Sequence, residues 1–411
     1  MNKSNGILES IFSLSILNVL NIFLPLITLP YLIRVVGLEK YGAYSVVYAI
    51  LQYALLFSSY GFIYSTTKEI SQNRNNIEEV NQIFNSTIVA RIVLSIVSLI
   101  LLFPILLLYN ESDYIWMYIY GIGIVIGDSL NPVWLFQGME KMRYMTIVNV
   151  ICKLIFTVLI FVLVNTPDDY IYILLYNSLG FVFSGIGSLY IAIKYFGVVL
   201  FFPSWHTVSL EIKLGWYVFV STLFMNLYRN SNIFILSFFV PEKLIGAYSG
   251  AEKMIKAAQS IASPVSNAFF PHFANQMVSK EKAVIRNIFS KLFAMMALFL
   301  VPITIVAYFC SDLINDFFLD PNDSRAVLLM KIMSPVIFFG GLNYILGIVG
   351  LVNLGKSVDF TKYVIIAGIT SIVFLLVSVK EMGVLSAAYA MTLSEVILFI
   401  MCFFRCRMLL R

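Results

Sequence analysis

The sequence predicts an all-α integral membrane protein with about 12 transmembrane helices in two pseudo-symmetric six-helix bundles. Composition gives the first reason, because hydrophobic residues make up 60% of the chain and charged residues only 12%, against about 45–50% and 25% in soluble domains. Long apolar segments recur along the whole chain, and a short motif returns half a chain later. This much apolar surface requires the bilayer as its solvent.

The predicted spans are windows of about 20 apolar residues that end where charged residues gather. The first window, 11–33, is too long for a signal-peptide core and lacks a small-residue cleavage site, so we expect it to remain as a span. The others, in chain order, are 43–65, 84–108, 114–135, 144–164, 170–193, 214–238, 247–273, 288–309, 326–350, 361–379 and 384–404. The connection 196–213 is expected to be a cytoplasmic linker between an N-terminal bundle, 1–195, and a C-terminal bundle, 214–411.

The distribution of basic residues predicts the orientation. Sixteen of the 27 Lys and Arg residues fall on the side of the two termini, including Lys291 and Lys362 at the ends of their spans, five fall on the opposite side, and the other six fall within the spans. Cytoplasmic loops carry the excess of Lys and Arg in membrane proteins. Both termini, and the loops at Lys68–Arg74 and Lys280–Arg286, are therefore expected to face the cytoplasm.

An internal repeat indicates a transporter. The sequence Glu-Lys-Tyr-Gly-Ala-Tyr-Ser at Glu39–Ser45 returns as Glu-Lys-Leu-Ile-Gly-Ala-Tyr-Ser at Glu242–Ser249, about 204 residues later. Six predicted spans separate the copies, so both halves share one orientation and their pseudo-symmetry axis runs along the membrane normal. Two similar bundles around a central site are typical of a transporter.

The apparent nucleotide-binding and metal-binding motifs of the sequence do not indicate such sites. Gly350–Ser357 matches the phosphate-loop pattern, but membrane helices are predicted on both sides of it, where a phosphate loop needs a strand and a soluble α/β domain. His206 and His272 lack ligand spacing. We expect no catalytic residue, no metal and no cofactor, and structural, reduced cysteines rather than a disulfide or metal site. The cysteines are Cys152, Cys310, Cys402 and Cys406.

Polar residues inside two predicted spans favour a wet, cationic cavity. Each intramembrane charge costs about 2.5–3.5 kcal/mol at a helix centre. The span 214–238 holds Arg229 among five polar residues in seven, and the span 247–273 places Glu252, Lys256 and Gln259 on one helical face. A structural Glu252–Lys256 pair with a snorkelling lysine nearby is the alternative. We favour the cavity, because Arg229 and Lys256 have one nearby acid between them.

These considerations select candidate residues for transport. The candidates for substrate binding are Arg229, Lys253, Lys256, Asn226 and Gln259, with Arg34 at the end of the first span. The candidates for ion coupling are Glu252, Glu395 and Asp128. Glu395 is either a neutral, packed side chain or a proton carrier. Without a nucleotide site, transport would draw on the substrate's own gradient or on coupled H⁺ or Na⁺.

Three segments carry a resemblance to a known family. The run Leu29–Ser45 resembles the junction of the first two helices in Wzx-type O-antigen translocases, which are bacterial flippases of the multidrug/oligosaccharidyl-lipid/polysaccharide exporter superfamily. Trp134–Lys141 and Gly246–Lys253 are similar to that family as well. The order and placement of the three segments, more than any single motif, extend the resemblance over essentially the whole chain.

The resemblance implies a substrate and its surroundings. The substrate would be an oligosaccharide repeat unit on undecaprenyl diphosphate, flipped from the cytoplasmic to the periplasmic leaflet of the bacterial inner membrane by alternating access, as in an antiporter. Cationic side chains bind phosphate oxygens well, which suits the diphosphate. The implied partners are membrane lipids, a polysaccharide polymerase and chain-length proteins, with no nucleic acid.

Two other functions remain as alternatives. A drug exporter of the same superfamily would more often need acidic residues in its cavity for cationic drugs, whereas the candidates here are mainly basic. A membrane-bound glycan polymerase or ligase would usually carry a large external loop with catalytic residues, whereas the predicted external loops are short.

Overall fold

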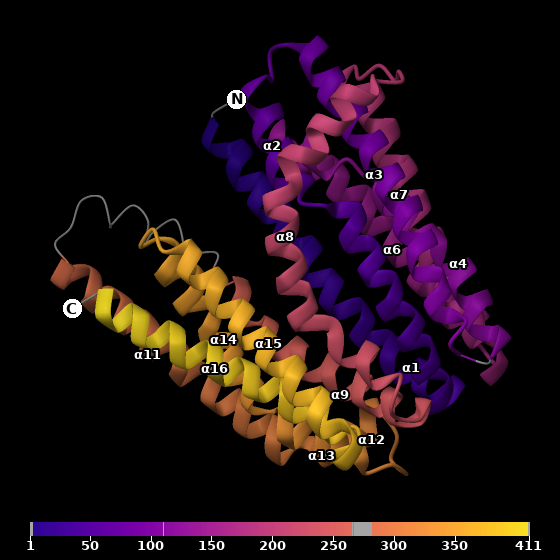
Figure 1. The fold of residues 1–411 in the computed structure, drawn as a ribbon, viewed down its shortest axis with the longest axis vertical. Coiled ribbons are helices and arrows are strands. Elements are labelled where there is room, and N and C mark those ends of the chain that lie inside the picture. The colour runs from indigo at the N-terminus through magenta and orange to yellow at the C-terminus, as the bar shows by residue number, and fades with distance from the viewer. Residues whose placement is uncertain (1–2, 110, 265, 267–281, 410–411) are drawn as a thin grey trace. The chain divides into compact units, whose positions relative to one another are not determined.

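The structure, a computed structural model, describes residues 3–109, 111–264, 266 and 282–409 (Figure 1). All regular elements within these residues are helices. By clustering of contacts the chain divides into two compact units. The first unit comprises Met1–Val36 and Ala43–Leu223, and the second comprises Gly37–Gly42 and Phe224–Arg411.

The helices of the first unit follow the predicted spans closely. They are α1 (Lys3–Ser59), α2 (Phe62–Gln72), α3 (Ile77–Leu106), α4 (Ser112–Ser129), α5 (Val133–Gly138), α6 (Met142–Leu163), η1 (Pro167–Tyr172), α7 (Ile173–Phe196) and α8 (Trp205–Leu236). Helix α7 packs along both α4 and α6. Two of these helices also reach into the second unit, because α1 contributes Gly37–Gly42 to it and α8 continues beyond Leu223.

Two glycines shape the first two predicted spans. Gly37 has φ 82° and ψ 164°, and it interrupts α1 where the sequence predicts the connection between spans. The second span was expected to run to residue 65, but α1 ends at Ser59. The reason is a left-handed pair, Tyr60 with φ 43° and Gly61 with φ 89°, from which α2 starts afresh. Glycine tolerates this conformation because it has no Cβ.

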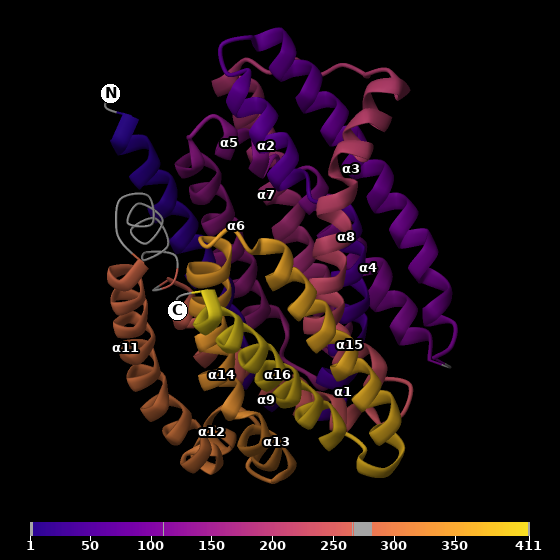
Figure 2. The same cartoon turned by 60° about the vertical axis from the view of Figure 1, so that its left-hand side comes forward.

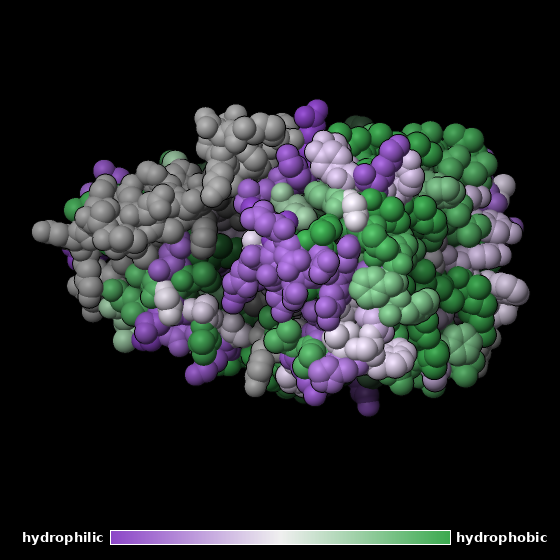
Figure 3. All heavy atoms as spheres, turned by 90° about the horizontal axis from the view of Figure 1, so that it is seen from above, coloured by the Kyte–Doolittle hydropathy of each residue, from purple (hydrophilic) through white to green (hydrophobic). Residues whose placement is uncertain are grey.

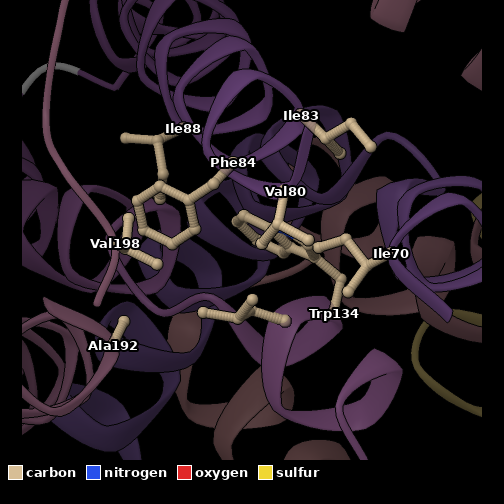
Figure 4. Packing of buried hydrophobic residues seen from close by; sticks show 9 residues of the cluster. Ile70, Val80, Ile83, Phe84, Ile88, Trp134, Ala192 and Val198 are labelled. Carbon is tan, nitrogen blue, oxygen red and sulfur yellow. The ribbon is translucent and has the colours of Figure 1, made fainter. Parts of the chain in front are cut away.

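Buried hydrophobic residues hold α2, α3 and α5 together. Ile70 of α2 packs in one cluster with Val80 and Phe84 of α3 and with Trp134 of α5 (Figure 4). All four side chains are essentially inaccessible to solvent. This cluster fixes the position of α2 beyond the end of the second predicted span.

The second unit contains the remaining helices. They are α9 (Glu242–Ser260), α11 (Lys282–Phe309), α12 (Ser311–Phe318), α13 (Arg325–Met333), α14 (Pro335–Asn343), the π-helix η2 (Tyr344–Val352), α15 (Ser357–Met382) and α16 (Leu385–Leu409). Helices α15 and α16 run side by side (Figure 2), and α9 packs on α13 and α14. The phosphate-loop match Gly350–Ser357 spans the end of η2 and the start of α15, so a helix lies on each side of it, as predicted.

Length and hydropathy identify a multi-pass membrane protein. Nine stretches of the described residues are long and apolar enough to cross a membrane, and the first of them, Val19–Gln72, covers two predicted spans. Hydrophobic side chains cover broad areas of the surface beside a patch of hydrophilic ones (Figure 3). A helix lies at each predicted span, although the end of the eighth falls outside the described residues. The count of twelve spans stays a prediction.

Candidate functional site

A chain of polar side chains links α8 and α9 inside the second unit. The Nζ atom of Lys256 lies 3.0 Å from Oε1 of Glu252, one helical turn away. Glu252 is nearly buried, with 8% of its side chain exposed, whereas 32% of Lys256 is exposed. The Tyr248 hydroxyl donates to the same Glu252 oxygen at 3.3 Å, and Nδ2 of Asn232 donates to that hydroxyl at 2.8 Å. A single carboxylate oxygen of Glu252 therefore accepts hydrogen bonds from both the Lys256 ammonium group and the neutral Tyr248 hydroxyl.

Lys253 faces a tyrosine in the second unit. Its Nζ donates to the Tyr41 hydroxyl at 2.5 Å and lies 5.0 Å from the centre of the same ring. Tyr41 belongs to the short segment Gly37–Gly42 that α1 contributes to this unit. An ammonium group over an aromatic face keeps its charge while part of its hydration is replaced. Lys253 and Lys256 are thus held by different partners.

Gln259 and Glu395 meet in the core of the second unit. Nε2 of Gln259 donates to Oε1 of Glu395 at 3.4 Å, and Nδ2 of Asn343 donates to Oε2 at 2.7 Å. All three side chains are buried. Gly340 permits this approach, because a Cβ there would lie 2.0 Å from Nε2 of Gln259. Two neutral amides surround the carboxyl, and the ion pairs formed by the described residues do not include Glu395.

Asp128, in the first unit, forms an ion pair with the buried side chain of Arg91. Nη2 of Arg91 lies 2.6 Å from Oδ2 of Asp128. The same guanidinium donates to the carbonyl oxygens of Ser58, at 3.2 Å, and Asn131, at 2.9 Å, and stacks over Trp134 at 5.1 Å. These contacts join α3, α4 and α5 to the end of α1. The arrangement suits a fixed structural pair, because breaking it would leave a buried guanidinium without its counter-charge.

Further polar contacts surround this pair in the first unit. Lys153 of α6 donates to the side chain of Asn21 and lies 5.7 Å from the ring of Phe181. The amide of Asn149 accepts from Asn131 at 3.1 Å and also from the Ser184 hydroxyl. Among the described residues, no group of three or more His, Cys, Asp or Glu side chains could hold a metal ion.

The remaining predicted residues lie in different places. Asn226 accepts from Nδ2 of Asn230 at 3.2 Å in the second unit. Arg34 is exposed and belongs to the first unit. Arg229 lies on α8, but its side chain falls outside the described residues. The structure thus brings Glu252 and Lys256 together and joins Gln259 to Glu395, and the proposed roles of all these residues stay predictions.

Several partners of the candidate residues are not apparent from the sequence. Tyr248 precedes Glu252 by one helical turn, so the i, i+4 spacing that indicated Lys256 could have indicated this hydroxyl as well. Asn232 was counted only as part of a polar run. Asn343 and Tyr41 carry no such signal, because each comes from a helix far from its partner in the sequence.

Comparison with known families gives a match over most of the chain. The family model described as polysaccharide biosynthesis protein matches residues 7–277. A "Putative O-antigen transporter" of Escherichia coli (strain K12) is 27% identical over 372 residues, which cover 89% of this chain and 88% of that protein. A protein with the same description from Shigella dysenteriae is 29% identical over 268 residues, or 65% of this chain and 67% of that protein.

Two solved structures with a similar fold are a drug transporter and a lipid flippase. An inward-facing multidrug resistance MATE family transporter of the MOP superfamily superposes with a TM-score of 0.78 at 12% identity, with 94% of each chain covered. The lipid II flippase MurJ in its inward closed conformation gives a TM-score of 0.76 at 14% identity, covering 96% of this chain and 87% of that one. At such low identity the likeness concerns the fold.

Proposed function

This chain belongs to the polysaccharide biosynthesis protein family, and on that premise we propose that it flips an oligosaccharide linked to undecaprenyl diphosphate from the cytoplasmic to the periplasmic leaflet of the bacterial inner membrane. The resemblance to Wzx-type flippases seen in the sequence is confirmed by the family match and the two relatives. The observation that carries the proposal is the match, over 89% of the chain, to a protein described as "Putative O-antigen transporter".

The second unit offers cations for a diphosphate. Lys256 and Lys253 lie on one helix, and each is anchored by a partner that phosphate oxygens could replace. A diphosphate and a polar glycan cannot cross hydrocarbon unaided, whereas a polyprenyl tail can stay in lipid. Lysine ammonium groups bind phosphate as point charges. We propose that Lys253, Lys256 and Arg229 bind the diphosphate or an acidic sugar, with Asn226, Gln259 and Arg34 contacting the rest of the head group.

Ion coupling is proposed to run through Glu252. Lys256 supplies the counter-charge of Glu252; a substrate phosphate that takes Lys256 would leave Glu252 buried without one, and Glu252 would then bind a proton or Na⁺ instead. Glu395, held by two neutral amides, is the second candidate. Asp128 is the weakest, because Arg91 already supplies its counter-charge. Alternating access of the two repeated halves would expose the site to each side in turn.

The function can be tested in two steps. Deleting the gene should block assembly of the surface glycan and cause a lipid-linked repeat unit to accumulate, whose chemical analysis identifies the glycan. In proteoliposomes, the purified protein should then flip that lipid, and an imposed H⁺ or Na⁺ gradient should change the rate or direction. Normal surface glycan after deletion would contradict the proposal. Loss of polymerisation without loss of flipping would instead favour a polymerase, and interaction with the polymerase and chain-length proteins can be sought in the same strains.

The second candidate is a drug exporter, which the fold shared with a MATE family transporter favours. Such a protein should raise resistance to cationic drugs and transport a cationic dye in the same proteoliposomes. The lysines on α9 argue against this activity, since two ammonium groups would repel a cationic drug.

A further inference from the structure

Two carboxyl groups meet in the first unit, outside the predicted spans. Glu69 lies near the end of α2, and Glu211 lies in the second turn of α8, before the predicted span 214–238. The two side chains are within hydrogen-bonding reach of each other. Glu211 is buried, with 7% of its surface exposed, and its Oε2 has no hydrogen-bond donor among the described residues. Nothing in the sequence distinguishes either residue from an ordinary solvated acid.

Rigid packing places α8 against α2. Phe219 of α8 stacks on Tyr60 with ring centres 4.4 Å apart, and both belong to a buried cluster with Phe62 of α2. The backbone at Gly61 comes so close to α8 that a Cβ there would lie 2.6 Å from a methyl group of Val218. These apolar contacts fix the first half of α8 on the first unit.

Ile70, which follows Glu69 on α2, is also held in place by packing. Ile70 is completely buried in the cluster with Val80, Phe84 and Trp134 (Figure 4). Because the backbones of both helices are held by packing, the main chains at Glu69 and Glu211 cannot move apart without disturbing one of the two clusters.

Two ionised carboxylates offer four acceptor oxygens and no donor, so a hydrogen bond between them requires one proton. The nearby charges do not remove this requirement. Lys68 of α2 attracts Glu69, and Glu79 of α3 repels it. On α8 itself, His206 and Lys213 are exposed to solvent. The ion pairs formed by the described residues include neither Glu69 nor Glu211.

We propose that Glu69 and Glu211 bind one proton in a shared carboxyl–carboxylate hydrogen bond, and that this proton fastens the first half of α8 to α2. Loss of the proton leaves two negative charges in contact in a poorly solvated place, and the repulsion loosens α8. Desolvation supports this assignment, since burial, followed by the charge of Glu69, raises the pKa of Glu211 to about 8. A proton that leaves near this pH responds to the acidity of the compartment on that side.

The site acquires a role in transport if the proposed function holds, because α8 belongs to both units. Its first half carries Glu211, and its second half carries Asn226, a candidate for substrate binding, and Asn232, which donates to Tyr248. A proton that fixes the first half therefore influences the helix from which substrate contacts arise. This proton site is separate from the coupling carboxylates named above, and we expect it to regulate flipping by the pH of the cytoplasmic side.

The proton itself can be observed by infrared spectroscopy. The full-length protein in detergent should show a protonated-carboxyl C=O band that disappears as the pH is raised, with a midpoint near 8. Glu211→Gln should remove this band, whereas Glu69→Gln, which leaves Glu211 buried but without the second carboxylate, should lower its midpoint; both keep the shape of the side chain. Glu78→Gln, in the exposed first turn of α3, is the matched control and should leave it unchanged. A band that Glu211→Gln leaves in place, or a midpoint that Glu69→Gln leaves unchanged, would overturn the proposal.

Regulation is tested separately in proteoliposomes. Raising the pH on the cytoplasmic side from about 6.5 to about 9 should slow flipping by wild type at least threefold, and the double variant Glu69→Gln/Glu211→Gln should lose this dependence. An unaltered dependence in the double variant would overturn the regulatory role. If wild type flips no lipid at any pH, the proposed function fails, whereas the infrared band still decides whether the proton is bound.

Discussion

Gly42 and Gly246 lie backbone to backbone, and each occupies the same position in one copy of the repeated motif. A Cβ on Gly42 would lie 1.9 Å from the carbonyl oxygen of Glu242, and a Cβ on Gly246 would lie 1.9 Å from that of Leu38. Leu38 precedes Gly42 by one helical turn, as Glu242 precedes Gly246, so the contact is reciprocal. The repeat thus marks a crossing of two helices within the second unit.

Replacing either glycine by alanine should damage the fold. The added methyl group would meet a main-chain carbonyl, which cannot move aside as a flexible side chain can. Gly42→Ala and Gly246→Ala should each cost roughly 1–3 kcal/mol or more through overpacking, visible as a lower thermal unfolding midpoint of the purified protein. Gly180→Ala on α7, whose Cβ would be 3.3 Å from a side-chain atom of Phe156, is the control. Equal midpoints for all three variants would show that the crossing is looser than it appears.

The pair of Glu252 and Lys256 should be more sensitive to loss of charge than to change of shape. Lys256→Ala leaves a carboxylate that is 8% exposed without its cation, so both flipping and stability should fall. Lys256→Arg should retain more flipping than Lys256→Ala, although the two cations differ in geometry. The double variant Glu252→Gln/Lys256→Ala should regain part of the lost stability but little of the flipping. Full flipping by Lys256→Ala would exclude this lysine from the substrate site.

Arg91 and Asp128 should behave as a structural pair. Arg91→Ala removes three hydrogen bonds, one to Asp128 and two to main-chain carbonyls, so little folded protein should reach the membrane; removing one member of a buried pair costs about 3–5 kcal/mol. Asp128→Asn should also reduce the amount of folded protein. The molecules that do fold should keep their response to an imposed ion gradient, measured per folded molecule in proteoliposomes. Loss of that response would restore Asp128 as a coupling residue.

How much the sequence could predict differs between helices and contacts. Apolar runs of bilayer length identify spans without knowledge of their neighbours, so a helix was found at each one. The pair Glu252–Lys256 was also accessible, because i, i+4 neighbours on a helix meet whatever surrounds them. The sequence would allow a loop of several residues between the first two spans. In the structure the single residue Gly37 makes this connection, because a glycine with positive φ can redirect the chain by itself.

Contacts between distant helices could not be predicted. Arg91 and Asp128 both fall within predicted spans, but their pairing depends on how α3 and α4 are rotated, which the sequence does not give. Glu69 and Glu211 look like ordinary solvated acids in the sequence, and only the packing of α8 on Tyr60 and Phe62 brings them together. The end of the second span was missed because Tyr60 gives no sign of its left-handed conformation.

The orientation of the chain can be tested with introduced cysteines. The charge distribution predicts that residue 282 faces the cytoplasm, since the loop at Lys280–Arg286 is strongly basic. In a variant without the native cysteines, Lys282→Cys should resist an impermeant thiol reagent in intact cells and react after lysis. Asp168→Cys, in a predicted external loop, should react in intact cells and serves as the control. Labelling of residue 282 in intact cells would reverse the predicted topology.

The raised pKa of Glu211 predicts how stability changes with pH. Burial raises this pKa from 4.5 to about 8 in the folded protein, so between these values the folded state holds a proton that the unfolded state has lost. The folded state binds more protons, and its stability therefore falls as the pH rises from about 4.5 to about 8 and is level with respect to this group above that range. The thermal unfolding midpoint of wild type should decline accordingly.

Glu211→Gln should remove most of this decline, because an amide keeps a hydrogen-bond donor for Glu69 and cannot ionise. At about pH 9 the variant should be more stable than wild type by roughly 2–4 kcal/mol, whereas near pH 5 the two should be similar. Glu78→Gln should follow the wild-type curve, since that side chain is exposed. Parallel curves for wild type and Glu211→Gln over the whole range would mean that Glu211 is ionised in the folded protein and that Glu69 and Glu211 share no proton.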